Sequence, residues 1–183
     1  MRFASSFLLL FIFPFLLFSQ ELEPVEWTTQ IKSVGPNEYQ LEFTAKMDEN
    51  WTVYSQFTSD EGPVPTSINY ESEGYELIGK AVEKGHKKEG PDALFEGVTV
   101  IKFLHDVPLV ITQRIQTAPG TENIAGYLNY MTCDNERCLP PTDVEFDFDL
   151  SSVAADPHAT APITTPVATK VGEEGELDPV TWV

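Results

Sequence analysis

Apolar and polar side chains alternate with a period of two through much of this chain. In residues 39–47 the apolar side chains are Tyr39, Leu41, Phe43, Ala45 and Met47, and the residues between them are polar. Residues 144–150 alternate in the same way. This pattern is typical of a strand with one buried and one exposed face. No stretch of useful length repeats with the 3.6-residue period of a helix, so we expect a fold made of strands.

Further stretches rich in apolar residues, separated by turn residues such as Pro119 and Gly120, predict more strands. They cover residues 25–31, 51–57, 75–82, 98–104, 109–116 and 125–132. Short strands at this spacing are typical of an antiparallel sandwich. The sequence therefore predicts an all-β, immunoglobulin-like domain at residues 21–150.

Residues 1–20 have the proportions of a secretory signal peptide. Arg2 is their only charge, an apolar run follows from Phe7 to Phe18, and small polar residues follow around Ser19. That run is shorter than the roughly 20 apolar residues of a membrane-spanning helix. We expect cleavage near residue 20, with an uncleaved anchor as the alternative. The mature protein is then soluble and exported, in a compartment where disulfides persist.

The composition changes after Leu150. Residues 151–175 are rich in Ala, Thr and Pro, which predicts a poorly ordered linker. The last eight residues, ELDPVTWV, repeat the spacing of Glu, Leu, Pro, Val and Trp in ELEPVEWT at residues 21–28. We interpret residues 176–183 as the possible start of a truncated second repeat of the domain. An edge strand that folds back on the first domain is the alternative.

The net charge of the chain is −18 at pH 7. Such a surface repels the phosphates of nucleic acids and the headgroups of anionic lipids. We therefore expect no nucleic acid partner and no binding to membrane surfaces.

The only two cysteines, Cys133 and Cys138, lie in the segment YMTCDNERCLPP. A structural disulfide across so short a loop stabilises a fold by only about 2 kcal/mol, against about 4.7 kcal/mol for a 100-residue loop. A zinc site would need two further ligands. The histidines do not lie at ligand spacing to the pair or to each other, so we expect no metal; they are His86, His105 and His158.

A redox-active pair is the third interpretation of the cysteines. The four residues between them are all polar, which predicts an exposed loop. Arg137 favours the thiolate of Cys138, whereas Asp134 and Glu136 oppose it. The residues alone leave this balance open.

The segment YLNYMTCDNERCLPPTDVEFDF resembles the active-site hairpin of the N-terminal periplasmic domain of the DsbD family of thiol:disulfide interchange proteins. The matching positions are Tyr130, Cys133, Cys138, Pro140 and Pro141. WTVYSQFTSDEGPVPTSINY also resembles a stretch of that family, and the likeness covers most of residues 22–150. The loop between the cysteines is one residue shorter than in a familiar variant of that family.

The resemblance implies a protein-disulfide reductase module with an immunoglobulin-like fold that works through two thiols and needs no cofactor. Its partners would be thioredoxin-like periplasmic proteins: an electron donor domain, and acceptors such as a disulfide isomerase or cytochrome c maturation proteins. This sequence contains no membrane domain and no thioredoxin Cys-x-x-Cys, so we expect the membrane electron donor on a separate or missing segment.

By the same resemblance, Cys138 engages partners and Cys133 resolves the mixed disulfide. In the family a loop with an aromatic residue caps the pair, and the matching segment here is residues 86–97. Phe95 is the candidate shield and Leu94 the alternative, while a core position for Phe95 stays open. Tyr130 and Arg137 are candidate supports near the site, although the core is the favoured place for Tyr130.

A function of another class also fits the sequence. The chain would then be an immunoglobulin-like binding or adhesion module, with a local structural disulfide and no electron transfer.

Overall fold

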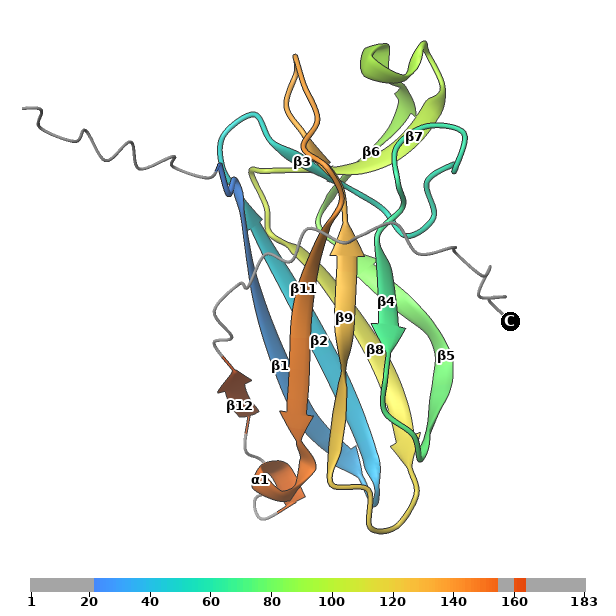
Figure 1. The fold of residues 1–183 in the computed structure, drawn as a ribbon, viewed down its shortest axis with the longest axis vertical. Helices are drawn as coiled ribbons and strands as arrows, with labels where there is room; N and C mark the ends of the chain where they lie inside the picture. The colour runs from blue at the N-terminus through green and yellow to red at the C-terminus, as the bar shows by residue number, and fades with distance from the viewer. Residues whose placement is uncertain (1–21, 155–159, 164–183) are drawn as a thin grey trace, which may run out of the picture.

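The computed structural model describes residues 22–154 and 160–163, and their fold is an all-β antiparallel sandwich, as the alternation predicts. One sheet has the order β12-β1-β2-β8-β5 and a second has the order β11-β9-β4. A smaller sheet, β10-β3-β7-β6, lies at one end (Figure 1). The strands are β1 (Val25–Gly35), β2 (Glu38–Met47), β3 (Thr52–Tyr54), β4 (Ser67–Tyr70), β5 (Tyr75–Lys84), β6 (His86–Pro91), β7 (Thr99–Leu104), β8 (Leu109–Thr117), β9 (Asn123–Tyr130), β10 (Thr132–Cys133), β11 (Thr142–Asp149) and β12 (Thr160–Ile163).

The core lies between the first two sheets, and period-two side chains fill it from both sides. Along β2 the odd-numbered residues are buried, while the residues between them are partly or fully exposed. The ring of Phe43 on β2 packs edge-on against Phe146 on β11, at a centroid distance of 5.1 Å, and against Phe148 at 6.0 Å. Trp27 and Trp51 are also buried, as the sequence predicts. Neither cysteine belongs to this main core.

Two predicted strands are longer than the observed ones. The strand predicted at residues 51–57 ends at Tyr54. The Ser55 amide still donates to the Ile101 carbonyl oxygen at 2.9 Å, but the Thr58 amide then donates to the Ser55 carbonyl oxygen at 3.3 Å and the chain turns. The strand predicted at residues 125–132 breaks at Met131. The two parts, β9 and β10, belong to different sheets.

The prediction of a loop at residues 86–97 is wrong for the first half of that segment. Residues 86–91 form β6, which pairs with β7 from His86 opposite Leu104 to Pro91 opposite Thr99. β6 is almost entirely exposed. Its sequence therefore shows no alternation of apolar and polar residues from which a strand could be predicted. Only the connection from Asp92 to Val98 is a turn, and it contains the 3₁₀ helix η1 (Ala93–Phe95).

Ordered structure continues beyond Leu150, where the sequence predicts a linker. The helix α1 (Leu150–Ala154) buries Leu150 and Val153 in the main core. β12 then pairs with β1, with Ile163 opposite Thr29, and covers an edge that would otherwise be open. The predicted signal peptide and second repeat, and the rest of the predicted linker, lie outside the described residues.

No helix within the described ranges is long and apolar enough to cross a membrane.

Candidate functional site

Cys133 and Cys138 face each other across a tight hairpin and form a disulfide, with their Cα atoms 4.0 Å apart. The Leu139 amide donates to the Thr132 carbonyl oxygen at 2.9 Å on one side of the pair. On the tip side, the Asp134 amide donates to the Arg137 carbonyl oxygen at 3.0 Å. The cysteines therefore occupy a non-hydrogen-bonded position, which is where antiparallel strands bring side chains closest together.

The tip of the hairpin is held by Asp134. Its Oδ1 atom accepts from the backbone amides of Glu136 at 2.7 Å and Arg137 at 2.8 Å, and these bonds lower the pKa of the Asp134 carboxyl below its usual value. The Arg137 Nε atom lies 3.6 Å from Asp134 Oδ2. Because its guanidinium faces a carboxylate, Arg137 offers Cys138 less cationic support than its sequence position predicts.

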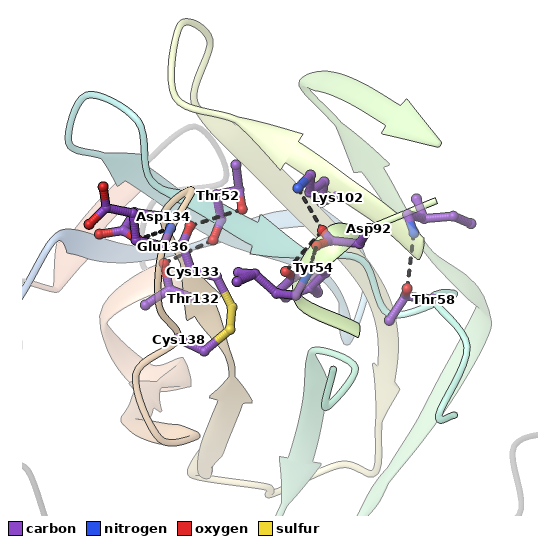
Figure 2. A network of polar contacts seen from close by, with 12 residues as sticks. Thr52, Tyr54, Thr58, Asp92, Lys102, Thr132, Cys133, Asp134, Glu136 and Cys138 are labelled. Carbon is purple, nitrogen blue, oxygen red and sulfur yellow. Dashed lines mark hydrogen bonds and ion pairs between the residues drawn. A yellow bond between two sulfur atoms is a disulfide. The ribbon is translucent and has the colours of Figure 1, made fainter. Parts of the chain in front are cut away.

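Two threonines anchor the hairpin to β3. The Thr132 hydroxyl donates to the Thr52 carbonyl oxygen at 2.8 Å, and the Thr52 hydroxyl donates to the Cys133 carbonyl oxygen at 3.1 Å. Figure 2 shows this pair of bonds beside the disulfide. Cys133 is therefore fixed to the sheet.

The two cysteines differ in accessibility. Cys133 is 1% exposed, whereas Cys138 is half-buried and follows the exposed tip of the hairpin. Cys138 is therefore the more accessible residue of the pair.

A small apolar cluster surrounds the disulfide and is separate from the main core. The turn between β6 and β7 lies at the same end of the molecule as the hairpin (Figure 1) and contributes Leu94 and Phe95, both half-buried. The Phe95 ring stands perpendicular to the ring of Tyr54 at 5.8 Å. The other members are Val98, Val100, Met131, Cys133 and Cys138. The structure thus brings the predicted shield residues and both cysteines into one cluster.

The remaining candidates lie farther from this cluster. Tyr130 packs in the main core, with its ring 5.4 Å from that of Trp27, and burial raises the pKa of its phenol to about 12. Pro140 and Pro141 are exposed and lead from the hairpin into β11. Tyr130 therefore supports the sandwich rather than the sulfurs.

Three polar residues near the site escaped the sequence analysis. Asp92 is buried at the start of the turn between β6 and β7, and its side chain contacts Lys102 and Tyr54. The available signal was the position of Asp92 just before a short apolar turn, which is typical of a helix N-cap. Pairing with Lys102 depends on the β6–β7 register, which the exposed β6 sequence does not reveal.

The fold and the hairpin define a class of protein: an immunoglobulin-like sandwich with a partly accessible cross-strand disulfide at one end. No protein-family model matches the sequence, and no curated protein matches it. Among solved structures, the chain is similar to the N-terminal periplasmic domain of ScsB from Proteus mirabilis, with a TM-score of 0.53 and 15% identity. The match covers 71% of this chain and 48% of that one, so this chain spans about half the length of that structure.

The N-terminal domain of DsbD from Neisseria meningitidis, in its reduced form, is also similar. Its TM-score is 0.45 and its identity 17%, over 74% of this chain and 89% of that one. The all-β sandwich that the resemblance implies is confirmed, and this chain shares its fold with the N-terminal periplasmic domain of ScsB.

We expect the fold to be independent of the disulfide, since neither cysteine belongs to the main core. Replacing both residues, Cys133→Ala with Cys138→Ala, should lower the free energy of unfolding by about 2 kcal/mol, the loop-closure value for so short a loop. Denaturant titration of the variant and of the oxidised parent measures the difference. An unfolded double variant would show that the bond is a structural staple.

We expect Phe95→Ala to speed alkylation of the reduced thiols and to leave stability nearly unchanged. The reason is that Phe95 packs in the small cluster beside the cysteines and is itself half-buried. Iodoacetamide kinetics and denaturant titration measure the two effects. Phe57→Ala, which truncates a 53% exposed ring, is the matched control and should change neither. A loss of ~3–5 kcal/mol with unchanged alkylation would instead place Phe95 among ordinary core residues.

Proposed function

We propose that this chain is an exported thiol–disulfide exchange domain of the DsbD N-terminal type. It carries reducing equivalents through the Cys133/Cys138 pair to disulfides of periplasmic proteins. The observation that supports this most is the position of the disulfide: it lies outside the main core, Cys138 is half-buried, and both cysteines belong to a small cluster with Leu94 and Phe95. A structural staple gains most by pinning the two sheets together, and this bond does not join them.

The chemistry begins with both cysteines reduced. The thiolate of Cys138 attacks one sulfur of a partner disulfide, forms a mixed disulfide, and releases the other partner sulfur as a thiolate. The thiolate of Cys133 then attacks the Cys138 sulfur, closes the internal disulfide and releases the second partner thiolate. The partner gains two electrons and this domain loses them, so a donor dithiol must reduce the domain again.

The accessibility of the two cysteines supports the proposed order of attack. Cys138 is half-buried near the exposed tip, where an external disulfide can approach it. Cys133 is buried, and its backbone is tied to β3 through the Thr52 hydroxyl. A fixed, buried thiol is suited to a reaction inside the complex, once Cys138 is already bound to the partner.

The proposal extends to partners and location. Thioredoxin-like proteins are the proposed donors and acceptors, and the acceptors include a disulfide isomerase or cytochrome c maturation proteins. Residues 1–20 are the proposed signal for export to the periplasm, residues 21–150 the redox domain, and residues 151–175 the linker. Within residues 151–175, Val153 of α1 lies in the main core and β12 pairs with β1. A second repeat is proposed to begin at residues 176–183, where the ELEPVEWT spacing recurs.

Single cysteine variants test the function and the roles together. Reduced Cys133→Ala protein should accumulate a covalent complex with an oxidised thioredoxin-like protein, because the resolving thiol is missing. Reduced Cys138→Ala protein should accumulate much less. Non-reducing electrophoresis and mass measurement detect the complex, and the double alanine variant is the control for non-specific adducts.

Trapping mainly through Cys133 would reverse the two roles and keep the redox function. If neither variant forms a complex with any of several thioredoxin-like proteins, the proposed function is wrong. The binding or adhesion module would then be the better account of the chain.

A further inference from the structure

A buried carboxylate, that of Asp92, lies at the start of the turn between β6 and β7, whose residues Leu94 and Phe95 share an apolar cluster with the two cysteines. The residue is 5% exposed. Its Oδ2 atom accepts from Lys102 Nζ at 2.7 Å and from the Tyr54 hydroxyl at 3.4 Å, while Oδ1 accepts from the Leu94 amide at 3.0 Å. A buried carboxylate without such partners would be strongly destabilising.

The charge state of Asp92 follows from these contacts. Burial pushes the pKa of the carboxyl upward, but the hydrogen bonds from Lys102 and the Leu94 amide outweigh it and hold the pKa below its usual value. Asp92 is therefore ionised at neutral pH, and it faces the ammonium group of Lys102, whose side chain is 21% exposed.

The backbone of the turn also converges on Asp92. Its amide donates to the Val98 carbonyl oxygen at 3.0 Å, and its carbonyl oxygen accepts from the amides of Phe95 at 3.2 Å and Gly97 at 2.9 Å. Gly97 has a φ of +85°, so the turn closes in a left-handed conformation that favours glycine. Backbone bonds at residue 92 thus close the cap turn, residues 92–98, and the Asp92 side chain adds the bond from the Leu94 amide.

Tyr54 connects this residue to the disulfide. It is fully buried, lies opposite Lys102 in the β3–β7 pairing, and packs in the same cluster as Cys133. Its hydroxyl reaches Asp92 and its ring contacts Phe95. Figure 2 shows Tyr54 between the disulfide and the Asp92–Lys102 pair.

We propose that Asp92, with Lys102 as its counter-ion, is a positioning residue that holds the cap turn closed over the disulfide and so sets how often Cys138 is open to a partner. This rests on the proposed function. An ion pair suits a cover that must open, because the cost of removing two charges from water largely offsets their attraction. When the turn lifts, both charges regain water, so opening is reversible.

Alkylation of the reduced protein tests the proposal without any partner. Asp92→Asn leaves the Lys102 ammonium half-buried without its counter-ion, and Lys102→Met leaves the Asp92 carboxylate alone. Each variant should react with iodoacetamide about tenfold faster than the parent, or more. Because the two residues act as one unit, the double variant should react no faster than the faster single one.

The matched control is a second side-chain contact of an aspartate on the same hairpin. His86 Nδ1 lies 2.7 Å from Asp106 at the end of β6–β7 opposite the cap turn, and both side chains are half-exposed. The thiols of reduced Asp106→Asn protein should be alkylated at the parental rate. Hydrogen exchange of the oxidised proteins supplies a readout that a purely structural role would not give. In Asp92→Asn, exchange should accelerate at the amides of Phe95, Gly97 and Val98, and not in β2.

Two results would overturn the proposal: alkylation of Asp92→Asn at the parental rate, or exchange that accelerates equally in β2 and in the cap turn. Either can occur while mixed-disulfide trapping succeeds, which would leave the redox function intact. Failure to trap a partner, with faster alkylation of Asp92→Asn, would instead reject the redox function and keep Asp92 as the residue that holds the turn.

Discussion

The packing of Phe43 against Phe146 and Phe148 joins the two sheets, and the rest of the molecule depends on it. The three rings come from β2 and β11, which lie in different sheets. Aromatic side chains bury large apolar areas, and edge-on contacts add to this stabilisation. Because the sheets are held by apolar packing, neither cysteine is needed to connect them, and the disulfide is available for chemistry.

The small sheet β10-β3-β7-β6 positions that chemistry. β3 lies at its centre and contacts both sides of the site: Thr52 bonds to the cysteine hairpin, while Tyr54 packs beneath the cap turn. The hairpin and the turn are more than thirty residues apart in the chain. The hairpin and the turn come together over β3. The disulfide there has one buried cysteine and one accessible cysteine, which suits the proposed two-step exchange.

Most strands of the main core could be predicted from the sequence because they have one exposed and one buried face. β2 and β11 show this most clearly. β4, which contributes Ile68 to that core, was not predicted, because its four residues are too few to show the alternation. β6 could not be predicted, since nearly all of its residues are exposed and only its register with β7 defines it. The proximity of Cys133 and Cys138 could be predicted because the two cysteines are close in the chain. Contacts between distant residues could not be predicted, such as that of Tyr54 with Asp92, 38 residues apart.

The reduction potential of the Cys133–Cys138 bond tests the central claim most directly. The oxidised protein would be equilibrated at pH 7 in a series of thiol–disulfide buffers, and the fraction with free thiols measured after rapid alkylation. Our account predicts a potential above about −300 mV, within reach of thioredoxin-like dithiols. A potential below about −300 mV is typical of structural disulfides and would contradict the claim that this pair carries electrons.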